Sequence, residues 1–145
     1  MRFLLIVSVA VAFSASVAQA QDAANGEKVF AQCRACHQTG PTAKNAVGPI
    51  LNGLIGRKAG SVEGYNYSPA NKNSGLTWDE ATFSDYIKDP KAKVPGTKMI
   101  YPGLKDEQRI KDLIAYLKQF DASGQKGAQI PGSLEIASPA IRPAF

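Results

Sequence analysis

The clearest pattern in the chain is an amphipathic period towards its C-terminal end. Four apolar residues recur there at the spacing i, i+3, i+4, i+7, which places them on one face of a helix: Ile110, Leu113, Ile114 and Leu117. Asp106 precedes this stretch and suits an N-cap, because its carboxylate can accept hydrogen bonds from free backbone N–H groups. The pattern predicts an amphipathic helix that begins after Asp106.

Two further stretches have helical character. Residues 22–33 carry acidic side chains early and place Gly26, Phe30 and Cys33 on one face. The segment Thr77-Trp78-Asp79-Glu80 has a hydroxyl and a carboxylate three residues apart, the arrangement of a capping box. It predicts a second helix that is capped by Thr77 and ends near Lys88, before Pro90.

The stretch from Gln38 to Leu76 carries no such pattern. It is rich in glycine and proline and lacks the alternation of a strand. A loop of this length is uncommon in a compact domain, so either elements are missed or the loop wraps a large group that is not protein. Three modest helices bury little apolar surface against the entropy of ordering such loops, which favours a bulky cofactor.

The N-terminal segment is typical of a secretory signal. Met1 and Arg2 precede an apolar or small run from Phe3 to Ala18, and Ala18-Gln19-Ala20 is a small-x-small cleavage site. The alternative is an uncleaved anchor, but the run is shorter than the roughly 20 residues that span a bilayer. We therefore expect residues 1–20 to be a signal peptide cleaved after Ala20, and the mature chain to enter a bacterial periplasm.

Composition narrows the classes of protein and of site. The chain has 145 residues, 44% apolar and 20% charged, which indicates one domain and excludes a wholly disordered chain or a coiled coil. One histidine and two cysteines exclude metal centres that need two histidines or four thiolates. The formal net charge is +5.

The segment Cys33-Arg34-Ala35-Cys36-His37 is a C-x-x-C-H motif, which in a secreted chain indicates attachment of a c-type haem. Two thiols three positions apart can add to the two vinyl groups of haem, and the adjacent imidazole then lies under the iron. The alternatives are a thioredoxin-like redox pair, a structural disulfide and a zinc site. The first would need a preceding strand, and the last lacks further ligands.

Met99 is the only methionine of the mature chain, and the sixth iron ligand cannot be a second histidine. Pro95 and Gly96 place Met99 on a turn, from which its thioether could reach the iron. A core-filling role, lysine ligation and an open sixth position are the alternatives. A thioether ligand raises the reduction potential and closes the iron to substrates, which suits an electron carrier better than an enzyme.

From Gly26 to Phe120 the chain resembles the class I c-type cytochromes, in particular the group of mitochondrial cytochrome c and bacterial cytochrome c2. Besides C-x-x-C-H, the resemblance rests on these segments: Gly48-Pro49-Ile50-Leu51, Gly56-Arg57-Lys58, Tyr65-Asn66-Tyr67, Ala70-Asn71-Lys72-Asn73, Leu76-Thr77-Trp78, Pro95-Gly96-Thr97-Lys98-Met99 and Leu113-Ile114-Ala115-Tyr116-Leu117. It implies an all-α cytochrome c fold over residues 21–120, with three main helices and long loops around one haem held covalently by Cys33 and Cys36.

The resemblance also implies roles for individual residues. His37 and Met99 would ligate the iron, and the Pro49 carbonyl would accept a hydrogen bond from His37. The haem propionates would be surrounded by Arg57, Tyr67 and Trp78. A polar network beside the Met99 sulfur would consist of Asn71, Tyr86 and Thr97. The first and last helices would cross where Gly26 and Phe30 pack against Leu113 and Tyr116.

Two departures from the family pattern are visible. Tyr101 follows the methionine where mitochondrial proteins have phenylalanine. Residues 121–145 have no counterpart in the short members of the family, and we expect them to form a loosely ordered extension.

The implied function is that of a soluble, monomeric periplasmic one-electron carrier. It would move electrons from a quinol:cytochrome c oxidoreductase to a terminal oxidase or a photosynthetic reaction centre. These membrane complexes would dock at a haem edge rich in lysine: Lys44, Lys91, Lys93, Lys98 and Lys105. Nucleic acid is not an expected partner. The alternatives are a dedicated electron acceptor of one periplasmic dehydrogenase, and a haem peroxidase or gas sensor with an open sixth position.

Overall fold

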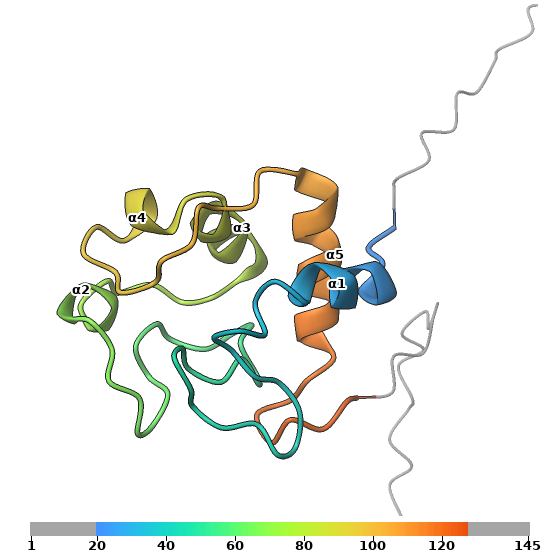
Figure 1. The fold of residues 1–145 in the computed structure, drawn as a ribbon, viewed down its shortest axis with the longest axis horizontal. Coiled ribbons are helices and arrows are strands. Elements are labelled where there is room, and N and C mark those ends of the chain that lie inside the picture. Colours follow the sequence, from blue (N-terminus) through green and yellow to red (C-terminus); the bar gives the residue numbers. More distant parts are fainter. Residues whose placement is uncertain (1–19, 128–145) are drawn as a thin grey trace, which may run out of the picture.

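The computed structural model describes residues 20–127, so the predicted signal peptide before Ala20 and the extension beyond Gly127 lie outside the described residues. This part of the chain contains helices and loops but no strand, apart from two isolated bridges (Figure 1). Its five helices are α1 (Ala23–Phe30), α2 (Pro69–Lys72), α3 (Glu80–Lys88), α4 (Pro90–Lys93) and α5 (Glu107–Lys118). The predicted all-α class is confirmed.

Helices α1 and α5 cross at close range (Figure 1). A Cβ built on Gly26 would lie 1.9 Å from the backbone oxygen of Asp112, so only glycine allows the two backbones to approach this closely. The rings of Phe30 and Tyr116 pack beside this point with their centroids 5.1 Å apart. The predicted crossing of the first and last helices is confirmed.

Helix α5 forms as its period predicts. The carboxylate of Asp106 accepts a hydrogen bond from the backbone N–H of Arg109 at 2.9 Å, and the four apolar residues of the pattern are all buried. The first predicted helix is shorter than expected, because α1 ends at Phe30 and turns follow it.

The prediction that Thr77 caps the second helix is wrong. Asp79 is the N-cap of α3, and its carboxylate accepts from the backbone N–H of Thr82 at 2.6 Å. Thr77 instead pairs with Lys58 in an isolated antiparallel bridge, so its backbone is already committed three residues before the helix. The predicted end near Lys88 is correct.

The two shortest helices were not predicted. Each begins with a proline behind a capping side chain: Ser68 accepts from the N–H of Asn71 at 3.1 Å, and Asp89 from that of Ala92 at 3.0 Å. A proline at the first helical position suits this arrangement because its missing N–H would have had no partner. Four residues are too few to show a hydrophobic period, so the pattern alone misses them.

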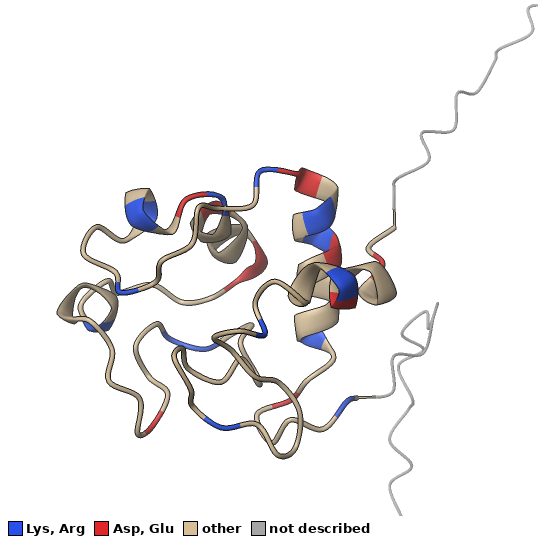
Figure 2. Cartoon of the chain, viewed as in Figure 1, with Lys and Arg blue, Asp and Glu red and all other residues tan. Residues whose placement is uncertain are grey.

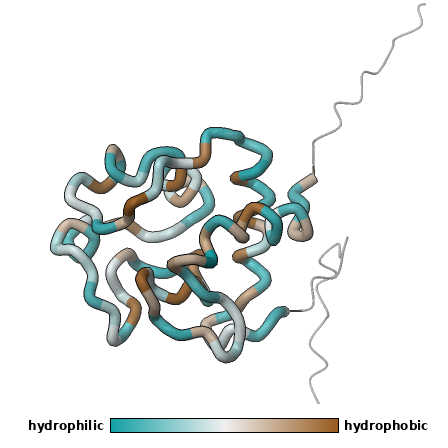
Figure 3. Tube along the Cα trace, viewed as in Figure 1, coloured by the Kyte–Doolittle hydropathy of each residue, from teal (hydrophilic) through white to brown (hydrophobic). Residues whose placement is uncertain are grey.

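The apolar residues of the described chain converge on its centre, while long stretches of the outer loops are hydrophilic (Figure 3). Several of the most buried side chains come from α3 and α5, among them Phe83, Ile87, Leu113 and Leu117. These same side chains line a central cavity, so the core of this protein is largely the wall of a cleft. None of the helices in residues 20–127 is long and apolar enough to cross a membrane.

We predict that Gly26→Ala destabilises the fold, because the new methyl group would overlap the α5 backbone. The free energy of unfolding should fall by about 1–3 kcal/mol, the usual cost of overpacking a tight contact. Guanidinium unfolding of the cofactor-loaded protein measures this loss. Ala24→Ser is the control, since Ala24 is exposed on the same helix; equal midpoints for both variants would contradict the close crossing.

Candidate functional site

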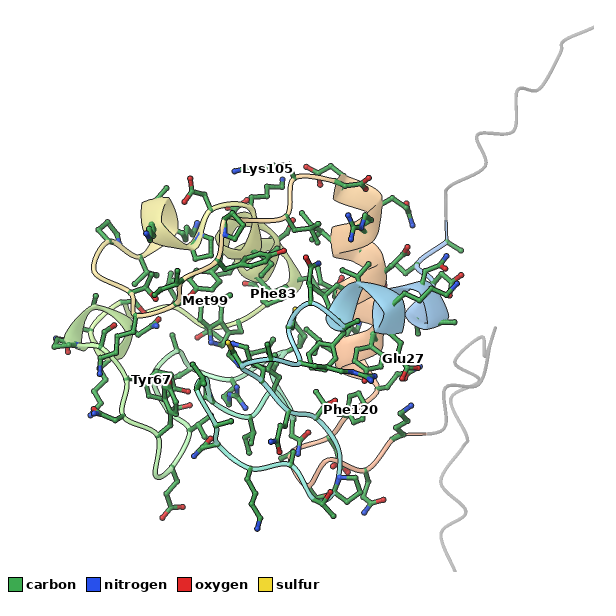
Figure 4. All side chains as sticks on the ribbon, viewed as in Figure 1. Glu27, Tyr67, Phe83, Met99, Lys105 and Phe120 are labelled. Carbon is green, nitrogen blue, oxygen red and sulfur yellow. The ribbon has the colours of Figure 1, made fainter. Side chains whose placement is uncertain are left out.

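A cavity of about 350 Å³ lies between α1, α3, α5 and the long loops. The C-x-x-C-H segment contributes to one part of its wall, and the segment around Met99 to another. Figure 4 shows Met99, Phe83 and Tyr67 around this centre. Every residue that the sequence predicts for the site lines the cavity except Thr97, which reaches it through hydrogen bonds: Cys33, Cys36, His37, Pro49, Arg57, Tyr67, Asn71, Trp78, Tyr86 and Met99.

Both cysteines sit in the helical turns that follow α1. The backbone N–H of Cys33 donates to Phe30 at 2.8 Å, and that of His37 donates to Cys33 at 2.9 Å, so the motif continues the direction of the helix. Cys33 and Cys36 are not joined in a disulfide. Burial, reinforced by the neighbouring Cys36, raises the pKa of the Cys33 thiol to about 11. A redox-active pair depends on a lowered thiol pKa, so the site does not fit a thioredoxin-like pair.

A zinc centre does not fit either. Within residues 20–127 no group of three or more His, Cys, Asp and Glu side chains could hold a metal ion. The two thiols are therefore available for covalent attachment of a cofactor.

The His37 imidazole is held in one orientation. Its Nδ1–H donates to the Pro49 carbonyl at 2.7 Å, which leaves Nε2 as the nitrogen available to a metal. Burial lowers the pKa of His37, against the opposing effect of the Pro49 hydrogen bond, and this favours the neutral imidazole that a metal requires. A Cβ on Gly48 would lie 2.3 Å from the ring atom Cε1, so the ring rests directly on the backbone of Gly48.

The Met99 thioether is surrounded by hydrogen-bonding groups. The Tyr86 hydroxyl donates to the sulfur at 3.3 Å, and the Thr97 hydroxyl accepts from the Met99 backbone N–H at 3.2 Å. Asn71 Nδ2 donates to the Thr97 hydroxyl at 3.3 Å, and the hydroxyls of Thr97 and Tyr86 are 3.4 Å apart. The structure thus brings together the four residues of the predicted network, while their role towards a cofactor stays a prediction.

A guanidinium lies in the same cavity. Arg57 donates from Nη1 to the Asn52 carbonyl at 2.7 Å and from Nη2 to the Ile50 carbonyl at 3.0 Å. Its Nε and the Oδ1 of Asn71 are buried and have no partner among the described residues. Because buried polar groups are rarely left unpaired, these two atoms mark places where a bound group would complete the hydrogen bonding.

The aromatic residues near Arg57 complete this side of the cavity. Trp78 is buried, and its ring centroid lies 4.8 Å from that of Tyr86. Tyr67 packs edge-on against Tyr65, with centroids 4.7 Å apart. Burial raises the pKa of the Tyr67 and Tyr86 hydroxyls, so both remain neutral hydrogen-bonding groups at neutral pH.

The residues present fit haem c. The cavity is mostly apolar, presents two thiols, one imidazole nitrogen and one thioether, and holds a partly buried guanidinium whose buried Nε–H is unpaired. Haem is a large apolar ring with a metal at its centre and two carboxylates at one edge, and each feature has a counterpart here. The long irregular stretch from Gln38 to Leu76 supplies much of the wall, in agreement with the loop predicted to wrap a cofactor.

Sequence reasoning missed part of the wall. Val47 and Ile100 line the cavity yet are 74% and 91% exposed, so they form its apolar rim. Their positions in the sequence could have identified them, since Val47 precedes Gly48-Pro49 and Ile100 follows Met99, all segments predicted to belong to the site. Tyr101, where the sequence departs from the mitochondrial pattern, also lines the cavity.

A second hollow of about 720 Å³ is wider and more open to solvent. It lies along the loop of residues 38–43 and the end of α5, and shares only Phe30 and His37 with the cavity. Neither thiol and no thioether reaches it, so it lacks the donor set for a haem.

Lysine and arginine positions are distributed along the whole described chain (Figure 2). Of the five lysines predicted to surround the cofactor edge, only Lys98 lines the cavity, and it donates to the Asn66 carbonyl at 3.2 Å. Lys93 pairs with Asp85 at 3.1 Å, and Lys105 donates to the Lys88 carbonyl at the end of α3. Lys44 and Lys91 are exposed.

Comparisons with known proteins agree with this geometry. Residues 23–121 match the family model described as Cytochrome c. Cytochrome c2 of Blastochloris viridis is 61% identical over 126 residues, which cover 87% of this chain and 99% of that protein. Cytochrome c-550 of Nitrobacter winogradskyi is 56% identical over 108 residues, or 74% of this chain and 99% of that protein.

A solved structure gives the same result. Cytochrome cH from Methylobacterium extorquens matches with a TM-score of 0.64 and 55% identity, covering 68% of this chain and 98% of that one. The stretch matched by the family model contains all five helices and every residue that lines the cavity.

We predict that Gly48→Ala displaces the His37 ring, because the added methyl group would overlap it. The displaced ring should lose its hydrogen bond to Pro49, at a cost of about 1–3 kcal/mol in the free energy of unfolding. Guanidinium unfolding measures this cost. The visible spectrum of the haem-loaded protein reports whether displacement of the His37 ring alters its predicted bond to the iron. Gly127→Ala is the control, since a Cβ there has no neighbour within 4 Å among the described residues. If both variants keep the parent's midpoint and spectrum, Gly48 does not support the ring.

Proposed function

The chain belongs to the cytochrome c family, and from this premise we propose that it is a periplasmic carrier that moves one electron at a time from a quinol:cytochrome c oxidoreductase to a terminal oxidase or a photosynthetic reaction centre. The family consists of electron carriers rather than enzymes, and it binds haem c covalently through cysteines, here Cys33 and Cys36. The observation that carries the proposal is one cavity lined by both thiols, the oriented imidazole of His37 and the thioether of Met99.

His37 Nε2 and Met99 Sδ are the proposed iron ligands. Haem c supplies an iron that can accept and release one electron. A histidine and methionine pair favours the ferrous state and leaves no position for oxygen or a substrate. A carrier needs both properties, because it must hold an electron without losing it to oxygen.

The surrounding residues keep both ligands in place. The Pro49 carbonyl holds the His37 ring, and the Tyr86 and Thr97 hydroxyls hold the Met99 sulfur and its backbone. A ligand that is held in the same way in both oxidation states moves little when the charge on the metal changes, and this favours fast exchange of electrons.

The remaining polar residues would bind the acidic edge of the cofactor. Arg57, Tyr67 and Trp78 are proposed to surround the haem propionates, and Asn71 belongs to the neighbouring network beside Met99. The unpaired Nε of Arg57 supports this assignment, because a buried carboxylate is costly unless it receives hydrogen bonds. The apolar wall of the cavity excludes water from the same region.

The positive charge supports docking to membrane redox complexes. Lys98 lies at the cavity and Lys91 and Lys44 are exposed, so these lysines can attract an acidic partner to the rim formed by Val47 and Ile100. Lys105 is also exposed and keeps its charge, while Lys93 is paired with Asp85 and would contribute less. The periplasmic location rests on the predicted cleavage after Ala20, and monomeric behaviour on the family resemblance.

The optical spectrum tests the ligand assignment. We expect a low-spin c-type spectrum in both oxidation states, a weak far-red sulfur–iron band when oxidised, and no response to carbon monoxide. Met99→Ala should open the iron to carbon monoxide and lower the reduction potential. A parent protein that is high-spin and binds carbon monoxide, or a variant that stays closed at the parent's potential, would show that Met99 is not the ligand.

Charge reversal tests the docking surface. The double variant Lys91→Glu, Lys98→Glu should react about tenfold more slowly with its acidic redox partner at low ionic strength, and the difference should shrink as salt is added. Stopped-flow oxidation by a purified terminal oxidase measures both rates. Lys28→Glu, Lys111→Glu changes the net charge equally, on helices α1 and α5 away from the cavity lining. Equal slowing by the two pairs would leave only a net-charge effect.

A further inference from the structure

The segment after α5 does not leave the domain directly but packs against its loops. The Gly53 backbone N–H donates to the Phe120 carbonyl at 3.1 Å, and the chain then turns back so that Phe120 and Lys126 pair in an isolated bridge. The Asp121 carboxylate closes this turn by accepting from the N–H groups of Ser123 at 2.8 Å and Gln125 at 3.0 Å. Figure 1 shows the segment beside the loops drawn in teal. We call residues 121–127 the C-terminal turn.

Gly124 brings the C-terminal turn into direct contact with two loops. A Cβ on Gly124 would lie 2.1 Å from the Gly40 carbonyl oxygen and 2.5 Å from Asn52 Nδ2. The backbone φ of Gly124 is 81°, in the left-handed region, so both space and conformation require glycine. Ala122 packs on the other side, where a Cβ on Gly53 would lie 3.0 Å from its Cα. The turn therefore packs against the Asn52 side-chain amide and against the backbones of Gly40 and Gly53.

The residues that the C-terminal turn contacts are linked by hydrogen bonds to the cavity. The buried Asn52 amide exchanges two hydrogen bonds with the backbone of Gly40, each of 2.9 Å. The backbone carbonyl of Asn52 accepts from Arg57 Nη1 at 2.7 Å. Arg57 in turn carries the unpaired Nε in the wall of the cavity. An unbroken series of contacts thus runs from Gly124, through Asn52, to the guanidinium in the cleft.

We infer that the C-terminal turn is a positioning element for Arg57: by holding the Asn52 side chain and the backbones of Gly40 and Gly53, it fixes residue 52, whose carbonyl orients the guanidinium in the cofactor cleft. This inference rests on the proposed function, in which Arg57 faces the haem propionates. It gives the first part of the extension a role that neither the sequence pattern nor the family resemblance supplied.

The inference predicts the direction in which a loosened Arg57 shifts the equilibrium between oxidised and reduced iron. A guanidinium that points reliably at the propionates offsets their negative charge, and that charge otherwise stabilises the more positive, oxidised iron. Loosening Arg57 should therefore favour the oxidised state. Hydrogen bonds to charged groups are stronger than those between neutral groups. A partial loss of the hydrogen bond from Arg57 to the propionates should therefore lower the equilibrium constant for reduction by about three- to tenfold.

Two substitutions loosen the turn to different degrees. Gly124→Ala introduces the overlap with Gly40, and Asp121→Ala only removes the carboxylate that closes the turn. Gly127→Ala is the matched control, because no atom of residues 20–127 lies within 4 Å of a Cβ there. Arg57→Gln removes the guanidinium itself. All four are made in the full haem-loaded protein. Redox equilibration against a reference dye gives the equilibrium constant for reduction of each variant. Hydrogen exchange at the side-chain Nε–H of Arg57 is followed by ¹⁵N NMR in every variant except Arg57→Gln, which lacks that group.

We expect Gly124→Ala and Asp121→Ala to lower the equilibrium constant for reduction and to speed hydrogen exchange at Arg57 Nε, with the larger effect for Gly124→Ala if that variant folds. Gly127→Ala should match the parent in both measurements. If Arg57→Gln shifts the equilibrium but neither turn variant changes it or the Nε–H exchange, the inference is overturned.

The Arg57→Gln variant separates this inference from the assignment on which it rests. If Arg57→Gln leaves the equilibrium constant unchanged, Arg57 does not face the propionates, and the inference fails with that assignment. The proposed carrier function is judged separately, by whether the parent and Gly127→Ala remain low-spin and insensitive to carbon monoxide.

Discussion

The close crossing of α1 and α5 at Gly26 is the contact on which the rest of this structure depends. Helix α1 leads directly into the C-x-x-C-H segment, so the position of α1 fixes where the two thiols and the imidazole lie. Helix α5 supplies Leu113 and Leu117 to the opposite wall and continues into the C-terminal turn. A single backbone contact between elements far apart in the sequence thus places the attachment motif relative to the helix that lines the same cavity.

The cleft also explains how so small a domain tolerates so much irregular structure. About half of its core side chains line the cavity, and two buried polar atoms there, Arg57 Nε and Asn71 Oδ1, lack partners within the described chain. A domain built in this way is complete only with its cofactor, because the bound group replaces both the missing apolar contacts and the missing hydrogen bonds. The long loops are ordered by what they enclose as much as by contacts among themselves.

The site was predictable from the sequence to an unusual degree because its chemistry depends on rare residues. One histidine, two cysteines and one mature methionine leave few choices for a haem ligand set, and spacing alone identifies the attachment motif. The second tier of residues, Pro49, Arg57, Tyr67, Asn71, Trp78, Tyr86 and Thr97, came from family resemblance, because no local pattern distinguishes a cavity-lining aromatic or arginine from an ordinary one. Sequence patterns gave the wrong N-cap where two residues, Thr77 and Asp79, could both cap the helix. They missed helices that are too short to show a hydrophobic period.

The sequence by itself determined the helix α5, the attachment of a haem and the class of function, since periodicity and ligand chemistry are local properties of a chain. The tertiary structure decided which backbone groups those residues meet. The clearest cases join segments that are apart in the sequence. They are the bridge of Thr77 with Lys58, the hydrogen bond from Lys98 to Asn66, and the series of contacts from Gly124 to Arg57. No pattern within one segment encodes such a meeting, because the close approach of two backbones exists only once the chain has folded.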